Sequence, residues 1–168
     1  DCVTMVPWNL YKNYGDISFL KDNFAAMKKF ISARERTMKD GIICEGHEFG
    51  DWLALDQERT SYETLIGRTD IFYITNVFQV ASLKIVAETA KLLGEKADEK
   101  VYRDKYERQL KRVREEYFTA GGRLCFDTIT AQVLALYFNV VPDEHRAKLA
   151  ETLNQNVIVH NYSLSTGF

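Results

Sequence analysis

The stretch EFGDWLALD, residues 48–56, places three carboxylates and a tryptophan within nine residues. The indole face of Trp52 can pack on the apolar C–H face of a sugar ring, while the carboxylate of Asp51 accepts hydrogen bonds from sugar hydroxyls. Gly50 before them allows a close backbone approach or a positive φ. This pattern suits carbohydrate binding, but taken alone it is a weak signal. Trp52 beside Leu53 and Leu55 is more typical of an anchor that pins a loop to the core.

Glycoside hydrolysis needs two carboxyl groups, one to protonate the leaving oxygen and one to activate water or to attack the sugar. The acidic cluster with aromatic company in a predicted loop consists of Glu45, Glu48, Asp51 and Asp56. Each of them taken alone is more typical of a solvated or capping group. The cluster therefore indicates a class of chemistry and assigns no catalyst.

Other chemistries find little support in the sequence. Cys44 and His47 have a spacing that could hold a metal, but no second pair completes four ligands, so we expect neither a metal nor a cofactor. Cys2, Cys44 and Cys125 are far apart and odd in number, which favours no disulfide framework. Motifs for acyl, phosphoryl and hydride transfer do not occur.

The composition is that of an ordinary globular domain: 168 residues, 46% hydrophobic and 27% charged, with a formal net charge of -2. A chain of this length can bury roughly 70% of the surface exposed on unfolding. Residues 103–114 hold six basic side chains, but interleaved acids favour a solvated helix face over a nucleic-acid site. Apolar runs of only a few residues predict neither a membrane span nor a signal peptide, and the compartment stays open.

Helical spacing dominates the chain and predicts an all-α fold. A helix capped by Asp16 should run to about Met38, with Leu20, Phe24, Met27 and Ile31 on its buried face. Residues 41–68 contain four glycines and form the predicted loop.

The later elements continue this rhythm. A buried helix is predicted from Thr69 or Asp70 to Gly94, and a charged outer helix after Asp98. Further predictions are a helix over residues 128–139, another that starts at Pro142 and fades near Asn154, and a short extended piece over residues 157–160. Apolar inner helices followed by charged outer helices are typical of αα-hairpins.

Three landmarks in order resemble one family: VPWNLYKNYGDISFLKDNFAAMKKFI, then FGDWLALD, then TAQVLALYFNVVP running on to LSTGF. Together they resemble the catalytic domain of bacterial α-L-rhamnosidases over essentially the whole chain. The resemblance implies an (α/α)6 barrel whose loops at one end form a sugar pocket. It also implies hydrolysis of terminal α-L-rhamnose, with inversion, from glycosides or polysaccharides. The charge and the short apolar runs described above predict neither a nucleic-acid nor a membrane partner.

The resemblance also carries specific residues. Asp51 and Trp52 match the aspartate and tryptophan of the family's sugar-binding GDW loop, and Asp1 matches an aspartate expected to contact sugar hydroxyls. Cys2 stands where the family has alanine, and the tryptophan and glycine expected before Asp1 are absent from the sequence.

The family's general acid is expected upstream of Asp1 and its general base downstream of Phe168. An inverting enzyme holds a water between two carboxyl groups about 6.5–9.5 Å apart. We therefore expect residues 1–168 to be the middle of the barrel, incomplete at both ends, with no catalytic residue and no activity alone. Exposed apolar helix flanks would then favour self-association.

Two alternatives remain open at this point. Another helical-barrel carbohydrate enzyme, such as a glucosidase or a trehalase, would use similar helix pairs and loop carboxylates. A non-catalytic helical-hairpin scaffold that binds protein would use a concave helix face and give Trp52 no role.

Overall fold

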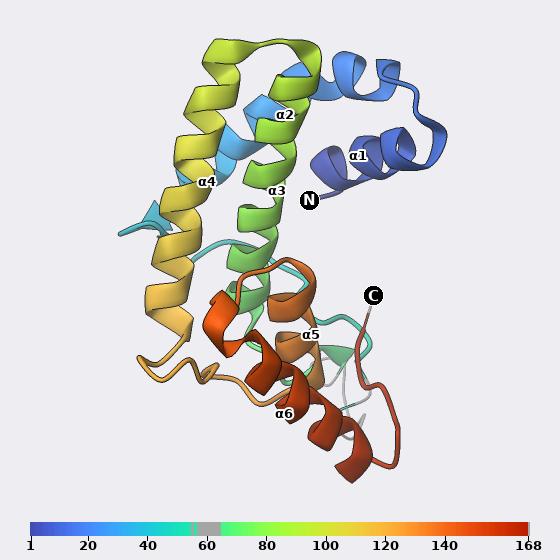
Figure 1. The fold of residues 1–168 in the computed structure, drawn as a ribbon, viewed down its shortest axis with the longest axis vertical. Coiled ribbons are helices and arrows are strands. Elements are labelled where there is room, and N and C mark those ends of the chain that lie inside the picture. The colour runs from blue at the N-terminus through green and yellow to red at the C-terminus, as the bar shows by residue number, and fades with distance from the viewer. Residues whose placement is uncertain (55, 57–64, 168) are drawn as a thin grey trace. The chain divides into compact units, whose positions relative to one another are not determined.

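The computed structural model describes residues 1–54, 56 and 65–167, and it confirms a mainly helical chain (Figure 1). These residues form two compact units: unit 1 holds residues 1–44 and 78–112, and unit 2 holds residues 45–77 and 113–168. The elements among the described residues are α1 (Cys2–Tyr14), α2 (Ser18–Glu35), β1 (Met38–Lys39), β2 (Ile42–Ile43), α3 (Ile71–Leu93), α4 (Lys96–Tyr117), α5 (Ile129–Tyr137), a 3-10 turn (Asp143–His145) and α6 (Arg146–Val159).

Aspartate side chains stand at the starts of α2 and α3. The N-cap residue of α2 is Ile17 and not the predicted Asp16, which lies one residue before it. Asp16 Oδ1 accepts a hydrogen bond from Ser18 N at 2.8 Å, and hydrogen bonds from Ser18 hold the pKa of this carboxyl below its ordinary value. Asp70 Oδ1 accepts from Tyr73 N at 2.7 Å at the start of α3. Gly94, with φ +75°, follows the last residue of α3 in the left-handed conformation that ends many helices.

The core of unit 1 is formed by α2, α3 and α4. The four predicted α2 side chains are all buried, and they pack against α3 and against Tyr102 of α4. Because these positions recur every three or four residues, they form one continuous stripe along the helix. The α3 side chains in this cluster are Leu83, Val86, Ala87 and Ala90.

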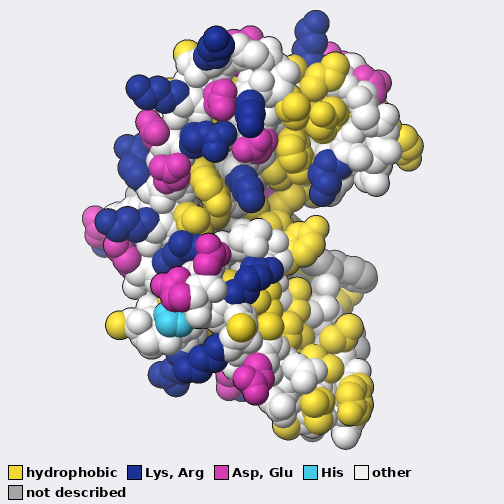
Figure 2. All heavy atoms as spheres, in the orientation of Figure 1, with side chains coloured by type: hydrophobic (Ala, Val, Ile, Leu, Met, Phe, Trp, Pro, Cys, Tyr) yellow, Lys and Arg dark blue, Asp and Glu magenta, His cyan; other side chains and the backbone are white. Residues whose placement is uncertain are grey.

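Polar contacts complete unit 1. The hydroxyl groups of Thr4 and Ser82 share a buried hydrogen bond of 2.9 Å that joins α1 to α3. Two ion pairs, Lys28–Asp98 and Lys105–Glu35, each with a closest distance of 2.7 Å, join α2 to the first half of α4. These pairs are partly exposed, so each is worth at most about 1 kcal/mol. Lys, Arg, Asp and Glu side chains alternate over α4 (Figure 2), which fits a solvated face.

α2 ends at Glu35 instead of Met38, because residues 38–43 form a small hairpin that the sequence reasoning missed. Met38 pairs with Ile43, and Lys39 pairs with Ile42. Asp40 and Gly41 between them both have positive φ, as a type I′ turn requires. The Asp-Gly dipeptide was the available signal.

α3 is the long apolar helix of the chain, and its composition alone would let it cross a membrane. However, 72% of its most apolar window is buried inside the protein, so its apolar character is explained by its place in the core. Among the described residues no other helix has this composition.

Aromatic packing holds unit 2 together. The Tyr73 ring contacts Tyr117 and Phe126, with centroids 5.1 Å away in both cases. Tyr73 Oη donates to Ala131 O at 2.8 Å, which ties α3 to α5. Burial, with a smaller contribution from Tyr117, raises the pKa of Tyr73 above its ordinary value, so the phenol remains a neutral donor.

α6 differs from its predicted course. It continues to Val159 and does not fade near Asn154, so the extended piece predicted for residues 157–160 is wrong. The backbone ladder continues through this β-branched segment, since His160 N still donates to Asn156 O at 3.1 Å. The helix stops where Asn161 and Tyr162 turn into the left-handed region, with φ 53° and 60°.

The buried stripe of α2 gives a stability prediction. Met27→Ala should lower the free energy of unfolding by about 2–5 kcal/mol, because it leaves a cavity at a fully buried position. Lys29→Ala, on the exposed side of the same helix, should change it by less than about 0.5 kcal/mol. Chemical denaturation of the two variants measures both values, and equal effects would contradict the assigned core.

Candidate functional site

The carboxylate of Asp51 is the centre of a set of loops in unit 2. Its side chain is buried, with only 4% of the residue exposed. Oδ2 accepts a hydrogen bond from Thr130 Oγ1 at 2.6 Å, and Oδ1 accepts from Gly167 N at 2.7 Å. The main-chain oxygen of Asp51 accepts from Gly67 N at 2.8 Å. One aspartate thus joins the GDW loop to the first turn of α5, to the segment before α3 and to the C-terminal loop.

Glycines let these segments approach so closely. A Cβ at Gly67 would lie 2.6 Å from Ala54 Cβ and 2.8 Å from Asp51 Oδ2. A Cβ at Gly167 would overlap the main-chain oxygen of Trp52. Gly50 has φ +62°, so the positive φ anticipated for it is confirmed. Larger residues at these positions would push the loops apart.

Trp52 is half-buried and its main chain is held in place. It forms an antiparallel bridge with Ile66. The Trp52 and Phe49 rings pack edge to face with their centroids 6.3 Å apart, and the Phe49 and His47 rings pack in the same way with their centroids 5.3 Å apart. Phe49 is 65% exposed, so this row of rings leads from the loop to the surface. Leu55, which the anchoring alternative invoked, lies outside the described residues.

Asp1 is the N-cap residue of α1, in unit 1. Its main-chain oxygen accepts from Thr4 N and Met5 N, both at 3.0 Å, and its side chain makes no capping hydrogen bond. Asp51 and Trp52 are therefore brought together within unit 2, whereas Asp1 belongs to unit 1.

The remaining sequence candidates have simpler surroundings. Asp56 accepts from Arg68 N at 3.0 and 3.2 Å with its two carboxylate oxygens, which closes the loop before α3. Within residues 1–54, 56 and 65–167, no three His, Cys, Asp or Glu side chains gather as metal ligands. Cys2, Cys44 and Cys125 are exposed free thiols.

Sequence reasoning missed Thr130, Gly67 and Gly167 as partners of Asp51. Two of them stood inside quoted motifs, Thr130 in TAQVLALYF and Gly167 in LSTGF. A threonine just inside a helix start and a glycine in a loop were visible signals, but neither indicates its partner.

Comparison with known proteins places this geometry in a family. Residues 1–168 match the family described as the bacterial alpha-L-rhamnosidase 6 hairpin glycosidase domain. The chain belongs to this family. The six-hairpin domain accounts for the helical hairpins of the fold and confirms the predicted all-α class as part of an (α/α)6 barrel.

Individual α-L-rhamnosidases are similar over the whole chain. The protein of Formosa agariphila is 30% identical over 169 residues, and that of Alteromonas sp. is 32% identical over 174 residues. The solved structure of Streptomyces avermitilis α-L-rhamnosidase complexed with L-rhamnose superposes with a TM-score of 0.87 at 29% identity, over 99% of this chain. The chain spans 18%, 18% and 15% of these three proteins, respectively.

The role of Asp51 as a structural tie gives a second prediction. Asp51→Ala should lower the free energy of unfolding by about 3 kcal/mol, because the hydroxyl of Thr130 and the amide of Gly167 both lose their buried acceptor. Thr130→Val should cost about 1–2 kcal/mol, since it removes one of these two bonds.

Chemical denaturation measures both variants against Asp143→Ala, which changes an exposed acid of the same unit. The control should alter stability by less than about 0.5 kcal/mol. An Asp51→Ala variant as stable as the control would show that the buried carboxylate does not hold the loops.

Proposed function

We propose that this chain is part of an α-L-rhamnosidase that releases terminal α-L-rhamnose from glycosides or polysaccharides with inversion of configuration. The observation that carries the proposal is the family match over residues 1–168. Three relatives support the proposal, since the similar proteins of Formosa agariphila, Alteromonas sp. and Streptomyces avermitilis are all named α-L-rhamnosidases. The same match argues against a protein-binding scaffold and against a glucosidase or trehalase.

Within this function, Trp52 is proposed to stack on the rhamnose ring. A stacking platform must be rigid and partly accessible, and Trp52 combines a fixed main chain with a half-buried ring. Rhamnose carries a methyl group and apolar C–H bonds, so it is a suitable stacking partner for the indole face of Trp52. The neighbouring ring of Phe49 supports the indole from the side.

Asp51 is proposed to orient this platform and to reach sugar hydroxyls with its remaining acceptor capacity. Each carboxylate oxygen already accepts one hydrogen bond from the protein, and each can accept another. The first task is structural, because the hydrogen bonds to Thr130 and Gly167 fix the position of the loop. Asp1 is proposed as a further contact to sugar hydroxyls.

The acid and base chemistry is proposed to come from outside residues 1–168. Inversion requires a carboxylic acid on the leaving oxygen and a carboxylate that activates water on the opposite face of the ring. In this proposal the chain supplies sugar recognition, and two glutamates elsewhere in the longer protein supply proton transfer. Binding residues then raise the rate by holding the sugar between those two groups.

Trp52 provides the direct test in the full-length protein. The wild type should hydrolyse 4-nitrophenyl α-L-rhamnoside and not 4-nitrophenyl glucosides. Trp52→Ala should lower kcat/KM on the rhamnoside by about tenfold or more, through lost stacking, and Trp52→Phe should lose less. Tyr14→Ala, which removes an exposed ring at the far end of α1 from Asp1, should leave kcat/KM unchanged. A glucoside-specific enzyme, or a Trp52→Ala variant with full activity, would contradict the proposal.

If sugar recognition lies within residues 1–168 and proton transfer lies outside them, a separate prediction follows for residues 1–168 produced alone. This polypeptide should show no hydrolysis of 4-nitrophenyl α-L-rhamnoside under conditions in which the full-length protein is active. Its exposed apolar helix flanks should also make it associate, which light scattering would detect as a mass above 19.4 kDa. Turnover by this polypeptide would show that a catalytic pair lies within it.

A further inference from the structure

A cavity of about 460 Å³ lies in unit 2, at the N-terminus of α5, the C-terminal end of α6 and the segment that follows α6. This volume is in the range of small-molecule sites, about 300–1,000 Å³. Most of the residues that line it are of polar type, and those that matter here are Asp56, Arg68, Asp127, Asn156, His160 and Ser163. The sugar pocket proposed above does not use these residues.

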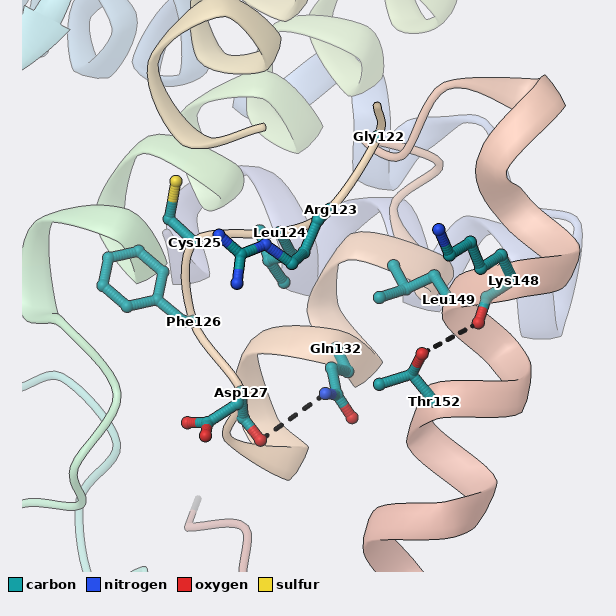
Figure 3. A pocket seen from close by; sticks show the side chains of 10 residues that line it. All are labelled: Gly122, Arg123, Leu124, Cys125, Phe126, Asp127, Gln132, Lys148, Leu149 and Thr152. Carbon is teal, nitrogen blue, oxygen red and sulfur yellow. Dashed lines mark hydrogen bonds between the residues drawn. The ribbon is translucent and has the colours of Figure 1, made fainter. Parts of the chain in front are cut away.

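Asp127 offers the cavity an ionised acceptor. Its main-chain oxygen is occupied, since Asn156 Nδ2 donates to it at 2.7 Å and Gln132 Nε2 at 3.5 Å. Figure 3 is drawn around another cavity that Asp127 also lines, and it shows the Asp127 carboxylate pointing away from Gln132. Among the described residues this carboxylate has no hydrogen-bond or ion-pair partner. An unpaired carboxylate at a cavity wall is a strong acceptor for hydroxyl groups.

Other groups of the lining add both donors and acceptors. His160 Nδ1 lies 2.7 Å from Asn156 O, and a carbonyl can only accept, so Nδ1 carries a proton. With Nδ1 as the donor, the Nδ1–H tautomer has Nε2 as its acceptor atom. Arg68 supplies guanidinium donors and Ser163 a hydroxyl.

This mixture favours a neutral polyhydroxyl ligand over an ion. An anion would meet Asp56 and Asp127, whereas a metal cation would meet Arg68 and would find no set of three ligands among the described residues. Sugar hydroxyls, which donate and accept, can satisfy all these groups at once.

Exposed apolar side chains lie next to the cavity lining in sequence. Val159, which lines the cavity, is 74% exposed, and Tyr162, which stands between the lining residues Asn161 and Ser163, is 75% exposed. Hydrophobic side chains gather over the end of α6 (Figure 2). Asn161 and Tyr162 hold the left-handed backbone that non-glycine residues rarely adopt. Because Tyr162 is exposed between two residues of the cavity lining, its ring is available for a sugar to stack on.

One segment, residues 163–167, both lines the cavity and contacts the loop that carries Trp52. Ser165 lines the cavity, and Gly167 donates to Asp51 and lies against the main chain of Trp52. We propose that this cavity is a second sugar subsite, which takes the neutral sugar attached to the rhamnose, with Asp127 as hydroxyl acceptor and Tyr162 as stacking face. The inference rests on the proposed function, because it assumes that rhamnose lies at Trp52.

The test uses the full-length protein with two substrates, 4-nitrophenyl α-L-rhamnoside and a disaccharide of α-L-rhamnose linked to glucose. Asp127→Asn and Tyr162→Ala should each lower kcat/KM on the disaccharide by about tenfold, the effect of one lost charge-assisted hydrogen bond or stacked ring. Both variants should stay within about twofold of wild type on the aryl rhamnoside, which carries no second sugar. Asp143→Asn, an exposed acid of the same unit that does not line the cavity, should alter neither substrate.

Two results overturn the subsite. One is an equal loss on both substrates, which would place Asp127 or Tyr162 in the rhamnose pocket or in the fold. The other is no loss on the disaccharide. Thermal unfolding midpoints of the variants separate a folding defect from the first result, and a Tyr162→Phe variant that restores disaccharide activity supports stacking.

Failure of the proposed function gives a different pattern. In that case the wild type hydrolyses neither substrate, and calorimetric titration of the same disaccharide into wild type and Asp127→Asn becomes the readout. Binding weakened about tenfold by the substitution supports a sugar site in the cavity. Equal binding by the two proteins, or no binding by the wild type, overturns it.

Discussion

The buried carboxylate of Asp51 is the interaction on which the loops of unit 2 depend. A charge removed from water is costly unless hydrogen bonds replace its hydration, and Asp51 recovers them from Thr130 and Gly167. Both donors sit on segments remote in sequence from the GDW loop. The cost of leaving this charge unpaired therefore couples the positions of the loops.

Rigid helices make such a tie effective. Tyr73 bonds α3 to α5 through Ala131 O, and its neighbouring aromatic rings fill the space beside it. This packing fixes the start of α5. The hydrogen bond from Thr130 in its first turn to Asp51 therefore determines the position of the GDW loop, while the helix keeps its own position. Loops carried on a packed scaffold are the usual place for binding residues.

The proposed rhamnosidase function would give this arrangement a use. A loop that presents a half-buried tryptophan, fixed by a buried aspartate and by glycines that admit no side chain, suits recognition of a sugar ring. The C-terminal loop both lines the cavity beside α6 and contacts the main chain of Trp52. In the proposed function this one loop would therefore lie next to two adjoining sugars. Selectivity for the glycoside and recognition of rhamnose would then be linked through the segment that contains Ser165 and Gly167.

The sequence by itself determined much of the local structure of this protein. The spacing of Leu20, Phe24, Met27 and Ile31 predicted a buried helix face, and the GDW motif singled out Asp51, the centre of the candidate site, because both signals lie within a few turns or residues of chain. The end of α6 and the small hairpin escaped prediction. The β-branched residues 157–159 favour an extended chain when they are taken alone, and each strand of the hairpin is only two residues long. Only the tertiary structure decided which groups meet Asp51, whose partners are 79 and 116 residues away. No local periodicity reaches so far; packing of the helices brings those donors to the carboxylate.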